Sequence, residues 1–232
     1  MQTEQAMRST TTLPAVALFV LGIASPTFAE DVLFADYFKN GLSEKWEVVG
    51  LHKKDYRVRD GGLEMRVQPG KLSDKGPMFK VVLPFTAADT VIVSVRVTLL
   101  NPLTVENEFA GVHLLTNGSR EFSAKKQRID GKTVFAPGKY QFIGKPGERG
   151  DPEKYTITYA NESDQAGPLR IIVDRGNALF QVGPSLDDKY QNFFHSAIGQ
   201  KATSRGSCLT AAGAPDKAEH WVRFTEFRVV KH

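Results

Sequence analysis

Short runs in which apolar and polar residues alternate are the strongest constraint that this chain places on its fold. The clearest run is Thr90–Leu99, in which every odd-numbered residue is aliphatic and most even-numbered residues are polar. A period of two puts successive side chains on opposite faces of a β-strand. One face of this strand is therefore predicted to be buried, and the other to be wetter.

Similar runs recur along the chain with turn residues between them and no long stretch of helical period. Leu169–Val182 reads as a hairpin around a glycine turn, and a change of phase at Thr225–Glu226 predicts a β-bulge within the last strand. Many short strands at close spacing predict an all-β fold, a two-sheet antiparallel jelly-roll sandwich. We expect Trp46, Trp221 and Cys208 in its interior.

The N-terminus is predicted to be an export signal. Leu13–Ala24 is an uncharged, largely apolar run that is too short to span a bilayer. Small residues at Thr27 and Ala29 predict cleavage after Ala29, and either Met1 or Met7 could be the true start. We therefore expect residues 1–29 to be a signal peptide and residues 30–232 to be a single domain, exported to the periplasm or beyond the cell without a membrane span. The alternative is an uncleaved N-terminal anchor.

Charge and cysteine content exclude several function classes. The net charge of +4 is too small to argue for nucleic acid, and a single Cys excludes a disulfide framework and a multi-Cys zinc site. Basic residues concentrate between Arg120 and Lys154. That segment could contact an acidic polysaccharide or an envelope phosphate, or it could be a solvated hairpin and loop.

A second predicted hairpin lies between Asn107 and Gln127. A three-residue turn, Thr116 to Gly118 with Gly118 left-handed, keeps the apolar residues of both strands on one face. This register pairs Leu115 with Ser119 and places His113 opposite Glu121.

The other face of this hairpin carries the candidate site residues. A carboxylate beside an imidazole can tune a base, so His113 and Glu121 are the candidate catalytic pair; an ordinary solvated pair is the alternative. Amide, hydroxyl and ammonium groups suit sugar hydroxyls, and an aromatic ring suits a pyranose face. The candidate ligand-binding residues are Asn107, Phe109, Ser123, Lys125 and Gln127. The alternative is a sheet face that a loop covers.

Four segments carry a resemblance to a known superfamily. FADYF (34–38) and WEVVG (46–50) are followed by DGGLE (60–64), and VRFTEFRV (222–229) closes the chain. Together they resemble the concanavalin A-like lectin/glucanase (laminin-G-like) jelly rolls, nearest the exported bacterial 3-keto-disaccharide hydrolase-like domains. The resemblance implies two curved sheets, one of them concave, and a glycan-related role. It also implies a structural Ca²⁺ held by Asp36 and Glu226 and no other cofactor, although Thr225 departs from the usual Asp.

No catalytic motif accompanies this resemblance. The chain lacks the paired carboxylates E-x-D-x-x-E of glucanases, and it lacks G-x-S-x-G, P-loop and H-E-x-x-H patterns. The first expectation is therefore an exported domain that binds carbohydrate on a polar concave face. A hydrolase or lyase acting on 3-keto-sugars or related glycans is the alternative, and a structural envelope protein is a further one.

Overall fold

The strand β7 (Val91–Leu99) shows how alternation builds the fold. In the computed structural model, which describes residues 30–70, 76–141, 154–157, 168–183, 191–198 and 204–232, its side chains at 91, 93, 95 and 97 are completely buried. Burial of one aliphatic side chain stabilises a fold by roughly 1.5–3 kcal/mol. The face predicted to be buried is therefore the face that packs inward.

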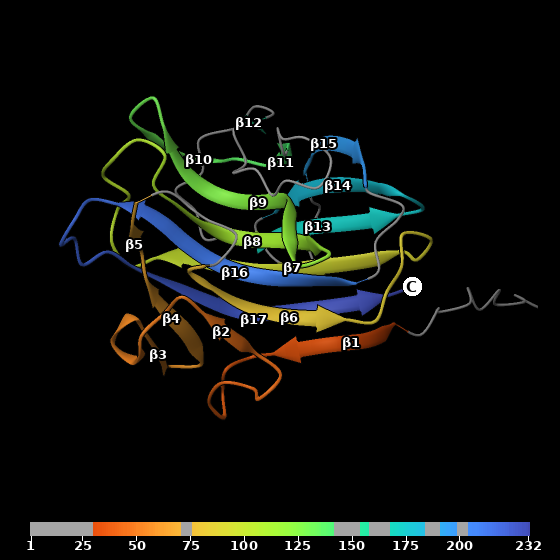
Figure 1. Ribbon diagram of the computed structural model, residues 1–232, viewed down its shortest axis with the longest axis horizontal. Helices are drawn as coiled ribbons and strands as arrows, with labels where there is room; N and C mark the ends of the chain where they lie inside the picture. The colour runs from red at the N-terminus through yellow and green to blue at the C-terminus, as the bar shows by residue number, and fades with distance from the viewer. Residues whose placement is uncertain (1–29, 71–75, 142–153, 158–167, 184–190, 199–203) are drawn as a thin grey trace, which may run out of the picture.

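Two sheets form the sandwich seen in Figure 1. Within the described residues, sheet A has eight strands, in the order β15 (Gln191–Ala197), β14 (Asn177–Val182), β13 (Pro168–Asp174), β7, β17 (Trp221–Lys231), β4 (Gly62–Arg66) and β3 (Tyr56–Arg59), and β1 (Asp31–Asp36) also pairs with β17. Sheet B, with nine strands in the described part of the chain, has the order β12 (Lys154–Ile157), β11 (Gly138–Gln141), β9 (Ser119–Ile129), β8 (Phe109–Thr116), β16 (Arg205–Ala214), β6 (Met78–Leu83) and β2 (Glu47–Val49).

Two short strands complete sheet B. The strand β10 (Lys132–Phe135) pairs with β9, and β5 (Gln68–Pro69) lies parallel to β16, whereas the other described pairs are antiparallel. The helix assigned among the described residues is a single 3₁₀ turn, η1 (Lys53–Asp55). The predicted all-β two-sheet sandwich is therefore confirmed.

Both sheets contribute side chains to one hydrophobic core. Aromatic rings pack edge-on in it: Trp46 lies 4.9 Å from Phe227 and 5.3 Å from Phe34 between ring centroids. Trp46 and Cys208 are buried as expected. Trp221 is not in the core: it is only partly buried, and the Arg57 guanidinium lies 4.4 Å from its ring centroid. The alternation of β17 puts this residue on the outer face of sheet A.

Two local predictions are confirmed by strand pairing. The strands β13 and β14 form the expected hairpin, with Asp174 opposite Asn177 across a turn at Arg175 and Gly176. The register between β17 and β7 shifts between Thr225 and Arg228, and Glu226 adopts a φ of 56° there. This is the β-bulge that the change of phase in the sequence predicts.

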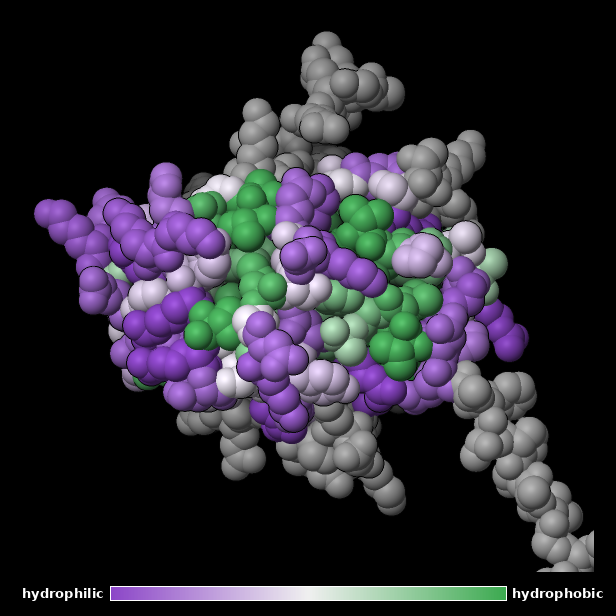
Figure 2. Space-filling model, turned by 90° about the horizontal axis from the view of Figure 1, so that it is seen from below, coloured by the Kyte–Doolittle hydropathy of each residue, from purple (hydrophilic) through white to green (hydrophobic). Residues whose placement is uncertain are grey.

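The lower edge of the sandwich carries β1, β2 and β3 (Figure 1). Figure 2 views the molecule from this side, and hydrophobic patches there are interrupted by hydrophilic side chains. Among the described residues, no helix is long and apolar enough to cross a membrane. The predicted signal peptide, residues 1–29, and residues 142–153 of the basic segment lie outside the described residues.

Candidate functional site

The β8–β9 hairpin holds most of the predicted site, and its register differs from the predicted one. The turn has two residues, Asn117 and Gly118, with φ of 52° and 79°. Thr116 pairs with Ser119, and the register then shifts so that Leu114 pairs with Phe122. Two left-handed residues in succession are typical of the tight turn that joins twisted strands.

The shift leaves Glu121 as an extra residue in β9, and this overturns the predicted contact with His113. His113 pairs with Ser123, while the Thr116 hydroxyl donates a hydrogen bond to the Glu121 carboxylate. The Arg205 guanidinium in turn donates to the Thr116 hydroxyl over 3.3 Å. The bulge restores the predicted alternation beyond it, so the predicted faces are right from Phe122 to Gln127, although the predicted partners are wrong.

The predicted ligand-binding residues and His113 share the face of the β8–β9 hairpin that points away from the core. Val112, Leu114, Phe122 and Ala124 belong to the core cluster, so alternation assigns the polar strand residues between them to the opposite face. Asn107 precedes β8 and joins this face through its hydrogen bond with Gln127. We call this set the polar strip; it consists of Asn107, Phe109, His113, Ser123, Lys125 and Gln127.

Contacts along the polar strip link its members. The Lys125 ammonium lies 4.3 Å from the centroid of the Phe109 ring, and that ring lies 6.2 Å from the His113 ring. Gln127 donates from Nε2 to Asn107 Oδ1 over 3.0 Å. The strip is more buried than an open sugar-binding face would be: His113 is 0% exposed and Lys125 is 4% exposed, whereas Asn107 is exposed.

Burial changes the protonation of the strip. Desolvation lowers the pKa of Lys125 to about 7, and the nearby Arg120 guanidinium adds to this effect. Desolvation also lowers the pKa of His113 well below its ordinary value, with further contributions from Arg120 and Lys125. His113 is therefore neutral at neutral pH, and Lys125 is only partly protonated there.

Gly111 makes room for this arrangement. It pairs with Lys125 across the two strands, and a Cβ atom added to it would lie 2.5 Å from the Lys125 Cα atom. A side chain at this position would push β8 and β9 apart. The backbone of Lys125 therefore lies where only a glycine partner allows it.

A second cluster was not foreseen, and it lies at the exposed end of the strip. The Nδ1 atom of His220 lies 2.6 Å from Glu108 Oε1, and the Glu108 side chain is completely buried. His220 and Glu108 are 112 residues apart, so no motif spacing signals the contact. Only the meeting of the starts of β8 and β17 brings them together.

The two predicted calcium ligands lie on neighbouring strands, as the resemblance implies, but each has another partner. Asp36 pairs with Phe227 across β1 and β17, and its Oδ2 atom accepts a 2.8 Å hydrogen bond from the Trp46 indole. Glu226 accepts from the Arg96 Nε atom over 3.2 Å. Within the described ranges, no three His, Cys, Asp or Glu side chains are grouped to hold a metal ion. A Ca²⁺ at Asp36 and Glu226 stays a prediction.

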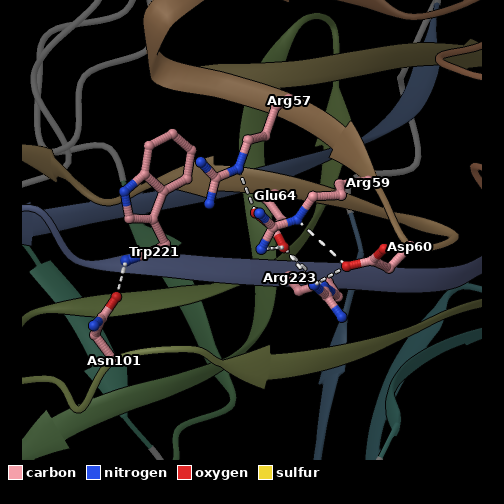
Figure 3. Close-up of polar contacts among 7 residues, drawn as sticks. All are labelled: Arg57, Arg59, Asp60, Glu64, Asn101, Trp221 and Arg223. Carbon is pink, nitrogen blue, oxygen red and sulfur yellow. Dashed lines mark hydrogen bonds and ion pairs between the residues drawn. The ribbon is translucent and has the colours of Figure 1, made fainter.

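A third cluster lies on the outer face of sheet A and is formed by ion pairs (Figure 3). Glu64, completely buried on β4, accepts hydrogen bonds from Arg57 on β3 and Arg223 on β17, at 2.5 Å each. Burial by itself raises the pKa of this carboxyl, but the hydrogen bonds from the two guanidinium groups outweigh it and lower the pKa. Arg59 and Asp60 extend the same network at 3.3 Å from each other.

Comparison with known proteins finds structures of similar fold but no matching family. No protein-family model and no curated protein sequence matches this chain. A CBM2 module of the evolved Dit protein of Lactobacillus casei BL23 phage J-1 has a TM-score of 0.59 and 10% identity, covering 87% of this chain and 95% of that one.

Two enzyme structures are also similar. A xylan β-1,4-xylosidase from Bacillus halodurans has a TM-score of 0.61 and 10% identity over 84% of this chain, which spans only 38% of the enzyme. The alginate lyase AlyC3 has a TM-score of 0.52 and 11% identity, covering 82% of this chain and 79% of that one. At these identities the likeness shows the fold alone: a β-sandwich of the kind found in proteins named for their action on carbohydrates.

Proposed function

We propose that this protein is an exported, carbohydrate-binding β-sandwich whose ligand contacts the exposed end of the polar strip. The observation that carries the proposal is the Asn107–Gln127 amide pair, in which the buried Gln127 orients an exposed Asn107. Amides both donate to and accept from sugar hydroxyls. Asn107 also has a φ of 68°, so the chain presents this side chain from a left-handed backbone position that Asn tolerates.

The comparisons support the same class of ligand, because the xylosidase and the lyase are named for polysaccharides. The cationic groups of the buried part of the strip, Lys125 and the neighbouring Arg120, favour a glycan that carries acidic groups. An acidic ligand and an exported location are both parts of this proposal.

Isothermal titration calorimetry of the purified protein with xylohexaose and with an alginate hexasaccharide tests the proposal. We expect binding to at least one of them and about tenfold weaker binding for Asn107→Ala, the usual effect of losing one hydrogen bond. Asn40→Ala, at an exposed position in the loop after β1, is the matched control and should bind normally. Absence of binding to both sugars, or equal binding by Asn107→Ala, would contradict the proposal.

One observation favours a second candidate, a hydrolase or lyase acting on glycans such as 3-keto-sugars. Buried groups with strongly shifted pKa values concentrate at catalytic sites, and both Lys125 and His113 have them. The catalytic role predicted for His113 and Glu121 would then not use a facing pair, because Ser123 faces His113. Release of reducing ends or unsaturated products from the same sugars, lost in Lys125→Met, would support this candidate.

A further inference from the structure

Glu108 is held in one orientation by its surroundings. Its Oε2 atom accepts hydrogen bonds from the backbone N–H groups of Thr104 (2.6 Å) and Val105 (3.3 Å). On the backbone, its carbonyl accepts from the Arg128 N–H over 2.9 Å. Gly213 lies against it, and a Cβ atom there would come within 2.8 Å of the Glu108 Cα atom. A completely buried carboxylate with this many fixed donors is a rigid acceptor.

The remaining oxygen of this carboxylate faces His220. An ionised carboxylate only accepts hydrogen bonds, so the His220 tautomer that fits the 2.6 Å contact between Nδ1 and Oε1 is the one with its proton on Nδ1. In the neutral imidazole the other ring nitrogen, Nε2, is then an acceptor. The His220 side chain is 18% exposed while Glu108 is 0% exposed. The buried partner therefore fixes the tautomer of a ring that reaches the surface.

The same place is the exposed end of the polar strip. Asn107 directly precedes Glu108 in the chain, and Gly213 packs against the backbone of both residues. Asn107 carries an amide, and the next residue, Glu108, holds the imidazole of His220. An amide nitrogen donates and a bare imidazole nitrogen accepts, and a sugar hydroxyl needs one partner of each kind.

We propose that His220 Nε2, oriented by Glu108, accepts a hydrogen bond from a hydroxyl group of a glycan bound at Asn107. This inference rests on the proposed carbohydrate-binding function and names the acceptor of its site. Glu108 is a positioning residue: it does not touch the ligand, and it sets which nitrogen of His220 does.

Two substitutions of His220 separate ligand binding from a structural role. The amide nitrogen of His220→Asn replaces Nδ1, so this variant keeps a donor for Glu108 and loses the Nε2 acceptor. The side chain of His220→Gln reaches the position of Nε2 and loses the Nδ1 contact. We expect His220→Asn to melt at the temperature of the unmodified protein and to bind the sugar about tenfold more weakly, as for one lost hydrogen bond. We expect His220→Gln to melt lower and to retain more of the binding.

The measurements are calorimetry with xylohexaose and the alginate hexasaccharide, thermal melting, and ¹⁵N NMR of the imidazole. His232→Asn, at the other end of β17, is the control and should change nothing. NMR should show a protonated Nδ1 and a bare Nε2 whose resonance shifts when the sugar is added. Normal sugar binding by His220→Asn, or a proton on Nε2, would overturn this inference and leave the proposed function intact. Absence of sugar binding by the unmodified protein would overturn both.

Discussion

The Glu64 cluster and the polar strip both hold several charged groups on a sheet face, but they solve the problem of charge in opposite ways. In the Glu64 cluster, two guanidinium groups share one buried carboxylate, and the pKa of that carboxyl is lowered. In the polar strip, Lys125 and His113 lie close to Arg120, and the pKa values of both are lowered by burial and by that neighbour.

The comparison teaches that paired opposite charges and crowded like charges have different effects on protonation and stability. Opposite charges within hydrogen-bond distance keep their ordinary ionised forms and join the strands that carry them. Like charges in a buried site instead lose protons at neutral pH, which is costly for stability and useful for chemistry or ligand binding. The Glu64 cluster is therefore expected to stabilise the fold, and the polar strip to carry function.

The largest expected effect breaks the polar strip itself. Gly111→Ala would place a Cβ atom 2.5 Å from the Lys125 Cα atom, and backbone cannot yield as a flexible side chain can. We expect a loss of at least about 3 kcal/mol in the free energy of unfolding, at the upper end for overpacked positions. Urea unfolding followed by tryptophan fluorescence measures it. A loss below about 1 kcal/mol would mean that the two strands separate easily.

The next effect removes the shared carboxylate from the Glu64 cluster. Glu64→Gln leaves Arg57 and Arg223 without their anion, and because both guanidinium groups are partly exposed we expect a cost of about 2–3 kcal/mol, below that of a fully buried pair. Glu47→Gln, in the surface pair with Lys80, is the control and should cost less than about 1 kcal/mol.

The pH dependence of the same variant has a definite sign. A carboxyl whose pKa is lowered by folding stabilises the fold above its unfolded pKa, and this contribution is lost as the pH falls through the folded pKa. Stability of the unmodified protein should therefore fall more steeply below about pH 4.5 than that of Glu64→Gln. Parallel curves would show that the ion pairs contribute nothing.

The smallest effect concerns Lys125. Its pKa is about 7 in the folded protein and 10.5 ordinarily, so between these values the unfolded chain binds one more proton than the folded one. Stability should therefore rise with pH in this window, by about 2 kcal/mol between pH 7 and pH 9. Lys125→Met should lack this rise, as urea unfolding at both pH values would show. An equal rise in Lys125→Met would mean that Lys125 is solvated.

Alternation was enough to predict the sheets, the β13–β14 hairpin and the bulge in β17, because these depend on local patterns. It also assigned the correct faces to β8 and to β9 from Phe122 onward, so six dispersed residues were correctly placed on one face. It failed on the pairing of His113, because the sequence does not show that a bulge at Glu121 compensates for a two-residue turn. A bulge needs only one residue that tolerates displacement, and Glu121 has no distinguishing side-chain pattern.

The other misses are contacts between distant parts of the chain. His220 meets Glu108, and Arg223 meets Glu64, only because β17 crosses the molecule between β7 and β4. Trp221 was expected inside because aromatic residues usually are, whereas its strand position puts it outside, beneath Arg57. These contacts depend on the order of the strands in the sheets, and no local sequence pattern predicts that order.

The chain has one thiol, and its position gives the molecule a reporter of its own. Cys208 lies on β16 opposite His113, is completely buried, and has its pKa raised by burial to about 11. Alkylating reagents attack thiolates, so this buried thiol does not react with them while β16 remains packed against β8. The rate at which Cys208 is labelled therefore measures how often β16 and β8 separate, one strand away from the proposed sugar site, without any engineered probe.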